Sequence, residues 1–163
     1  NVKLYDKYKK VASGTSLVEL SNSIEHKDSP RIVAAKVDNH IKELSYKLYN
    51  DCSVEFIDMS NEDGIRIYLR SLTFIFIKAC REIFPHCHVS IEHSLGNGLY
   101  CEVHGDFALS PRQVKRIDDK MHEIVSKDEP FERIKMSIDE AREIFNSMEF
   151  YDKLDIVKYR PEK

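Results

Sequence analysis

The clearest hydrophobic pattern of the chain lies between residues 61 and 84. Apolar residues recur there at spacings of three and four, which predicts a long helix with one buried face. The pair Phe84-Pro85 ends this helix, because proline cannot continue it. The face predicted to be buried consists of Ile65, Tyr68, Leu69, Leu72, Ile75, Phe76, Ala79, Cys80 and Ile83. A second stripe on the same helix consists of Ile67, Arg70, Phe74 and Ile77.

Residues 1–60 show the patterns of short strands around one helix. Ser16, with Glu19 three positions later, has the spacing of a capping box and predicts the start of the helix. Dense apolar runs predict strands at 32–37 and 54–57, and Asp38-Asn39 predicts a turn after the first of them. Strands before and after one helix predict a β-grasp, ubiquitin-like domain over residues 1–60.

Residues 61–163 predict a second, α+β domain. A hairpin is expected over residues 88–104, because placing Val89 opposite Val103 and Ile91 opposite Cys101 puts the apolar residues on one side. This register also places His88 opposite His104, Ser90 opposite Glu102 and Glu92 opposite Tyr100. Further helices are predicted at 110–128, with Ser110-Pro111 at its start, and after Ser137, where Glu140 completes a capping box. The buried stripe predicted for the first of these helices is Val114, Ile117, Met121, Ile124 and Val125.

Composition and charge limit the possible functions. The chain has 163 residues, 42% of them hydrophobic and 33% charged, which is the balance of a protein that folds around a core in water. Its net charge is -3, so no overall basic field attracts nucleic acid and any such binding must be local. The charged start of the chain is not a signal peptide, and no apolar run is long enough to span a membrane. We therefore expect a cytoplasmic protein with four reduced cysteines.

The histidines and cysteines between positions 86 and 104 suggest a metal site at first sight. The predicted register turns Cys101 toward the core, and helical periodicity does the same for Cys80. His88 and His104 then remain as weak metal candidates, with Glu102 as the one further candidate on their face, which is short of a four-ligand zinc site. We expect an exposed cross-strand histidine pair and no cofactor in this chain.

A resemblance to known families follows from longer strings. IVAAKVDNHIKELSYKLYNDCSVEFIDMSNEDG, preceded by a Gly-Thr-Ser turn, resembles the TGS domain that threonyl-tRNA synthetases share with certain GTPases and stringent-response synthetases. HCHVSIEHSLGNGLYCEVHG and FERIKMSIDEAREIF resemble the second domain of threonyl- and alanyl-tRNA synthetases, which edits mischarged tRNA. The resemblance implies a TGS-like domain at 1–60 and an editing-like domain at 61–163 that stops before the last motif of the family.

The catalytic histidines of the editing family are missing at the matching positions. Its first motif is His-x-x-x-His, and alignment on IKACREIFP places Arg70 and Phe74 there. Phenylalanine cannot bind a metal or transfer a proton, and arginine is permanently protonated. The sequence therefore predicts no catalytic residue at this degenerate motif.

Two functions remain open from the resemblance. The first is a non-catalytic region that binds RNA or a nucleotide, or regulates the C-terminal catalytic domain of a uridine kinase-like protein. ATP and magnesium would bind only in that further domain, because this chain has no P-loop. The alternative is the N-terminal editing region of a threonyl-tRNA synthetase, which hydrolyses mischarged seryl-tRNA(Thr). A stand-alone editing protein is a third possibility that lacks the same groups.

A ligand cleft is the functional hypothesis for the second stripe of the long helix. Arg70 would pair with an anion and Phe74 would stack on a ring, with Ile77 and Tyr100 as further candidates. In the structural alternative, Phe74 and Ile77 pack under a neighbouring strand and Arg70 is solvated.

Overall fold

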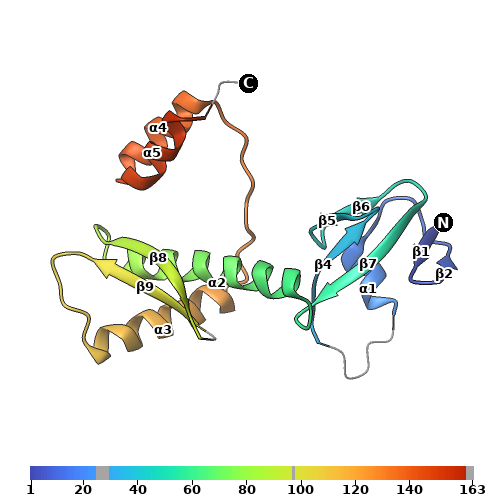
Figure 1. Cartoon of the computed structure of the whole chain (residues 1–163), viewed down its shortest axis with the longest axis horizontal. Coiled ribbons are helices and arrows are strands. Elements are labelled where there is room, and N and C mark those ends of the chain that lie inside the picture. Colours follow the sequence, from blue (N-terminus) through green and yellow to red (C-terminus); the bar gives the residue numbers. More distant parts are fainter. Residues whose placement is uncertain (25–29, 97, 161–163) are drawn as a thin grey trace. The chain divides into compact units, whose positions relative to one another are not determined.

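The computed structural model describes residues 1–24, 30–96 and 98–160, which form two compact units (Figure 1). The first unit is Asn1–Leu72 and the second is Thr73–Lys163. Helix α2 (Glu62–Ile83) belongs to both, because the units meet between two of its residues. The mixed α+β class is confirmed, whereas the domain boundary between residues 60 and 61 stays a prediction.

A five-stranded sheet in the order β2-β1-β7-β4-β5 forms the body of the first unit. β1 runs parallel to β7, and the other neighbours are antiparallel. A small second sheet pairs β3 with β6, and α1 follows β3 directly. The elements are β1 (Val2–Leu4), β2 (Lys7–Lys9), β3 (Thr15–Ser16), α1 (Leu17–Asn22), β4 (Ile32–Val37), β5 (His40–Lys42), β6 (Lys47–Leu48) and β7 (Cys52–Asp58).

One face of this sheet carries the core of the first unit. Val2 and Leu4 are buried while Lys3 between them is exposed, which is the alternation of a strand with one covered face. Leu17 and Leu20 of α1 fill the covered side and are essentially inaccessible. Burial of each such leucine contributes about 1.5–3 kcal/mol. The cluster comprises Val2, Leu4, Leu17, Leu20, Ala35, Val37, Leu48, Val54 and Phe56.

Local sequence signals explain where these elements begin and end. The Ser16 hydroxyl accepts the Glu19 backbone N–H, and the Glu19 carboxylate accepts the Ser16 backbone N–H, so the predicted capping box is confirmed. Asp38 and Asn39 have φ values of 47° and 64°, and the turn they form connects β4 to the antiparallel strand β5. Asp and Asn tolerate this left-handed region better than most residues, which explains their use here.

The start of α2 covers part of the other face of the sheet. Ala34 and Ile57 are buried although they lie outside the main cluster. A Cβ atom on Gly64 would lie 1.9 Å from the backbone oxygen of Asp58 and 3.3 Å from Cγ2 of Ile57. The lack of a side chain at Gly64 therefore lets α2 lie against the end of β7.

The second unit combines the rest of α2 with a hairpin and three helices. These elements are β8 (His88–Leu95), β9 (Gly98–His104), α3 (Pro111–Ser126), α4 (Ile138–Ser147) and α5 (Tyr151–Lys158). In Figure 1 the hairpin lies beside α2 and α3. Their shared core consists of Ala79, Cys80, Cys87, Ile117 and Ile124, with Val89 and Val103 of the hairpin packed against it.

The register of the hairpin confirms four of the five predicted pairs. His88 faces His104, Val89 faces Val103, Ser90 faces Glu102 and Ile91 faces Cys101. The prediction that Glu92 faces Tyr100 is wrong, because the register shifts between Ile91 and His93 and places His93 opposite Tyr100. Such a bulge adds one residue to one strand and is not visible in a strict alternation. The predicted turn at Gly96-Asn97-Gly98 includes Asn97, which lies outside the described residues.

Helices α3 and α4 begin as predicted. Ser110 and Gln113 form a capping box with Pro111 in the first turn of α3, and Ser137 and Glu140 form one on α4. The segment between α4 and α5 is attached to the end of α2. Arg81 donates to the backbone oxygen of Met148, and its guanidinium carbon lies 4.2 Å from the Phe150 ring centre.

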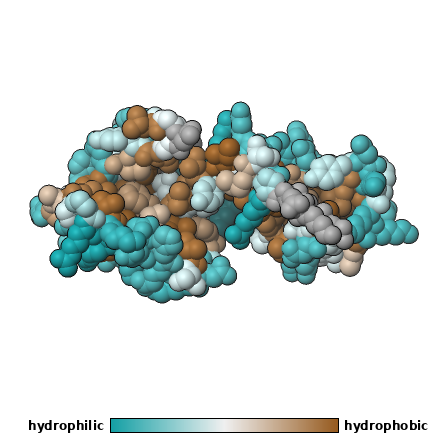
Figure 2. Space-filling model, turned by 90° about the horizontal axis from the view of Figure 1, so that it is seen from below, coloured by the Kyte–Doolittle hydropathy of each residue, from teal (hydrophilic) through white to brown (hydrophobic). Residues whose placement is uncertain are grey.

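Several apolar residues predicted to be buried are exposed. Ile65 and Tyr68 of α2 are 43% and 48% accessible, because this part of the helix precedes the core of the second unit. Val114 and Val125 of α3 are also exposed. Figure 2 shows apolar patches at the surface between charged side chains. In the described part of the chain, no helix is both long and apolar enough to cross a membrane.

Candidate functional site

The degenerate motif positions lie on the exposed side of α2. Arg70 is exposed and forms no ion pair with any described residue. Phe74 is 68% accessible, and Ile77 is half-buried. Phe74 meets Phe131 edge to face, with ring centres 5.9 Å apart. The expectation that Phe74 packs under a neighbouring strand is therefore wrong, and solvation of Arg70 agrees with the structure.

Tyr100 belongs to a ladder of polar side chains on the hairpin. Its ring stacks on His93 with centres 5.1 Å apart, and its hydroxyl donates to Glu102 at 3.1 Å. The hydrogen bond to the Glu102 carboxylate raises the pKa of the Tyr100 phenol above its usual value. These contacts tie Tyr100 to the hairpin itself, and its role in a ligand cleft with Phe74 stays a prediction.

His88 and His104 form the expected cross-strand pair. Their ring centres are 6.3 Å apart and the rings are nearly parallel. Nε2 of His104 lies 2.9 Å from Glu102, and Nε2 of His88 lies 3.2 Å from the Ser90 hydroxyl. Over residues 1–24, 30–96 and 98–160, no three His, Cys, Asp or Glu side chains are grouped so that they could hold a metal ion. The pair therefore has the geometry of a surface stack.

The cysteines of the second unit are poor nucleophiles. Burial, and then the neighbouring Cys87 and Cys101, raise the pKa of Cys80 to about 12. Burial likewise raises the pKa of Cys87 and of Cys101. The reactive form of cysteine is the thiolate, so these thiols are inert at neutral pH. All four cysteines of the chain are free.

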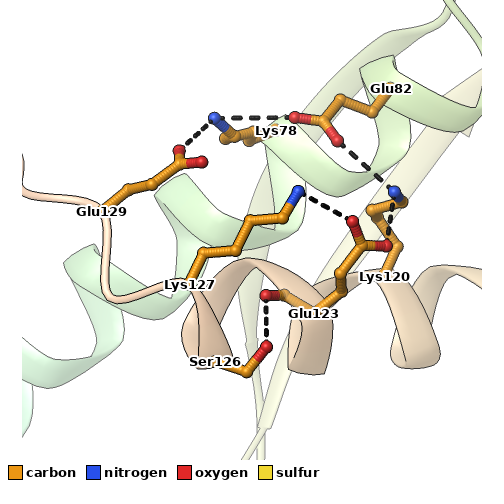
Figure 3. A network of polar contacts seen from close by, with 7 residues as sticks. All are labelled: Lys78, Glu82, Lys120, Glu123, Ser126, Lys127 and Glu129. Carbon is orange, nitrogen blue, oxygen red and sulfur yellow. Dashed lines mark hydrogen bonds and ion pairs between the residues drawn. The ribbon is translucent and has the colours of Figure 1, made fainter.

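A network of lysines and glutamates joins α2 to the end of α3 (Figure 3). Lys78 pairs with Glu82 at 3.5 Å and with Glu129 at 2.8 Å. Glu123 accepts from Lys120 at 2.6 Å and from Lys127 at 2.8 Å, and these bonds lower its pKa to about 2. Each lysine is thus neutralised by a carboxylate, which makes this surface a structural contact rather than a phosphate site.

One surface was missed by the sequence analysis. On the part of the sheet that α2 does not cover, Lys3 and Tyr8 face each other across β1 and β2, and both are exposed. Tyr5, 60% accessible, follows at the end of β1. The signal was present in the sequence, because lysine and tyrosine alternate there with the buried residues Val2 and Leu4.

Comparison with known proteins gives a consistent group of relatives. No family model matches the chain. The chain is similar to a threonine–tRNA ligase of Desulforamulus reducens, with 28% identity over 151 residues that cover 93% of this chain. A threonine–tRNA ligase of Clostridium kluyveri is 26% identical over 152 residues, again 93% of the chain. One from Streptomyces griseus is 33% identical over 112 residues, which are 69% of the chain and 17% of the relative.

The matched part is a minor fraction of these relatives. The chain spans 24% of the length of the Desulforamulus and Clostridium proteins. The similarity nevertheless extends through both compact units, because 93% of the chain is covered. The comparisons therefore favour the threonyl-tRNA synthetase alternative over the uridine kinase-like one.

Proposed function

We propose that this chain is an accessory region of a threonyl-tRNA synthetase-like protein, placed ahead of its catalytic domain. We also propose that it binds tRNA without hydrolysing the aminoacyl ester of a mischarged tRNA. The observation that carries the proposal is the similarity to threonine–tRNA ligases over 93% of the chain. In this proposal the first unit is a TGS-like β-grasp domain. Its parallel pair β1–β7, with α1 on one face of the sheet, supports that assignment.

The second unit is proposed to be an editing-like domain that has lost the catalytic residues for ester hydrolysis. Hydrolysis of a mischarged ester needs a general base or a metal-bound water. The two motif positions hold Arg70, which keeps its proton, and Phe74, which has none to exchange. The raised pKa of Cys80, a buried thiol on the same helix, makes it a poor nucleophile as well.

The remaining functions of the protein are proposed to lie in other parts of it. The relatives are about four times as long as this chain, since it spans 24% of them. A C-terminal catalytic domain would bind ATP and magnesium, and tRNA would be the partner that the two parts share. Hydrolysis of seryl-tRNA(Thr) by this region is the competing function, and one assay separates the two.

The test is deacylation of seryl-tRNA(Thr) by the chain, with and without added zinc, together with filter binding of the same tRNA. The double variant Arg70→His/Phe74→His restores the family motif, and Arg66→His on the same helix is the matched control. We expect tRNA binding without hydrolysis by the natural chain. Hydrolysis by the natural chain would establish the competing function, and failure to bind tRNA would refute the proposed role.

A further inference from the structure

The uncovered part of the five-stranded sheet has the composition of a nucleic-acid surface. Two rows of side chains cross the strands there. The first row is Tyr8, Lys3 and Ser53 on β2, β1 and β7, as their pairing requires. The second row is Glu55, Lys36 and Ile41 on β7, β4 and β5. On this side Gly64 of α2 lies against Ile57, and Asp63 of α2 pairs with the half-buried Lys36. The other members of the two rows remain exposed: Tyr8, Lys3, Ser53, Glu55 and Ile41.

Two tyrosines stand out on this surface by their exposure. Tyr8 is 76% accessible and Tyr5 is 60% accessible. Tyr5 also lines a shallow depression together with Lys3, Asn39, Ser53 and Glu55. Exposed aromatic rings that are not packed on their own fold are platforms on which bases can stack.

The cations beside the rings are not neutralised. Among the described residues, no ion pair involves Lys3, Lys7 or Lys10. Only Lys3 shares a face with Tyr8, because Lys7 lies opposite the buried Leu4. Lys9 donates to the Ser23 hydroxyl at 2.7 Å and has no carboxylate partner there. Residues 1–10 thus carry four lysines against one aspartate, Asp6. Toward the other end of the surface, Lys36 pairs with Asp63 at 3.6 Å and Glu55 adds a negative charge.

We infer that this surface binds single-stranded RNA, with bases stacked on Tyr5 and Tyr8 and a phosphate held by Lys3. The inference rests on the proposed function for its choice of RNA and adds the place and mode of binding. Unpaired bases are required because a duplex hides their faces within its own stack. The charge complementarity is local, which is how a chain of net charge -3 can bind a polyanion.

The experiment measures the anisotropy of a fluorescein-labelled 12-nucleotide single-stranded RNA titrated with the full chain. Tyr8→Leu and Tyr5→Leu remove the rings, and Tyr8→Phe keeps one. Loss of one stacked base weakens binding at least about fivefold, whereas Tyr8→Phe should bind like the natural chain. Tyr159→Leu is the matched control, because Tyr159 is 86% accessible and lies in the second unit.

Neutralising a positive or a negative charge on this surface should change RNA binding in opposite directions. Lys3→Gln should weaken binding and reduce the slope of log affinity against log salt by about 0.7, the value for one phosphate contact on a single strand. Glu55→Gln should strengthen binding, because it removes a like charge beside the phosphates. A double-stranded RNA of the same length should compete poorly.

Three results would overturn the inference. They are no binding by the natural chain, equal binding by the tyrosine variants, and equal competition by the duplex or by inorganic polyphosphate. The RNA carries no amino acid, so the result does not depend on the deacylation assay. Hydrolysis of seryl-tRNA(Thr) would refute the proposed function but would not contradict RNA binding by this surface. Absence of RNA binding by this surface would not change the result of the hydrolysis assay.

Discussion

The two compact units are stabilised in different ways. The first buries nine apolar residues in one cluster under a five-stranded sheet. The second has five buried residues in its cluster, two of them cysteines, under a hairpin of two strands. It adds the lysine–glutamate network of Figure 3, and it has two helix capping boxes where the first unit has the one on α1. The comparison indicates that burial of apolar side chains is the main source of stability in the first unit. Polar contacts at the surface contribute a larger share of the stability of the second unit.

Truncation of the core of the first unit should have the largest effect. Leu17→Ala removes a fully buried side chain and should lower the free energy of unfolding by about 2–5 kcal/mol. Hydrogen exchange measured by mass spectrometry can follow the peptides of each unit. Val18→Ala, at a neighbouring position that is 42% accessible, is the control and should change little. Equal effects of the two variants would contradict the assigned core.

A methyl group at Gly64 should have the next largest effect. The new Cβ would collide with the Asp58 backbone oxygen, and relief of such a clash costs about 1–3 kcal/mol. Urea unfolding should therefore show a lower midpoint for Gly64→Ala, although alanine normally favours a helix over glycine. Gly98→Ala is the matched control, since its nearest atom would be 3.7 Å away. A stabilised Gly64→Ala variant would rule out the close contact of α2 with β7.

Loss of a cap in the second unit should have a smaller effect. Ser110→Ala removes the hydroxyl that accepts the Gln113 N–H and should cost about 1 kcal/mol. Hydrogen exchange should increase in α3 first. Ser94→Ala on the exposed part of β8 provides the comparison. No difference between the two serines would show that packing alone holds α3.

Acid should weaken the second unit through Glu123. Its pKa is about 2 in the folded chain against 4.5 for the ordinary group, so the stabilisation is present above pH 4.5 and is lost as the pH falls through 2. Glu123→Gln should therefore reduce the dependence of urea unfolding on pH between 5 and 2. Glu143→Gln, at an exposed position of α4, is the control, and its urea unfolding should depend on pH as that of the natural chain does. An unchanged acid profile in Glu123→Gln would show that the network does not stabilise the fold.

Local signals in the sequence were sufficient for much of the fold. The capping pairs Ser16–Glu19 and Ser137–Glu140 are confirmed, because such a motif needs only residues three positions apart. Apolar alternation gave the register of the hairpin up to Ile91. It failed at Glu92, since a bulge depends on how the strand must bend over its neighbours.

Burial and the candidate site were harder to predict because they depend on tertiary contacts. Ile65 and Tyr68 continue the helical stripe of α2, yet no core covers them at that point of the helix. Phe74 was expected under a strand and instead contacts Phe131, from a segment without regular structure. The alternation of Lys3 and Tyr5 with buried residues was readable, but only the strand pairing placed Tyr8 beside them.

The buried cysteines of the second unit can report its transient opening. Cys52 lies in the first unit, and Cys80, Cys87 and Cys101 lie in the second. Cys80 and Cys87 are buried and burial raises the pKa of both, so their alkylation requires exposure of the thiol. Cys52 and Cys101 are only half-buried. The labelling rate of Cys80 and Cys87, set against that of the half-buried Cys101, therefore reports the opening of the second unit without a probe having to be introduced.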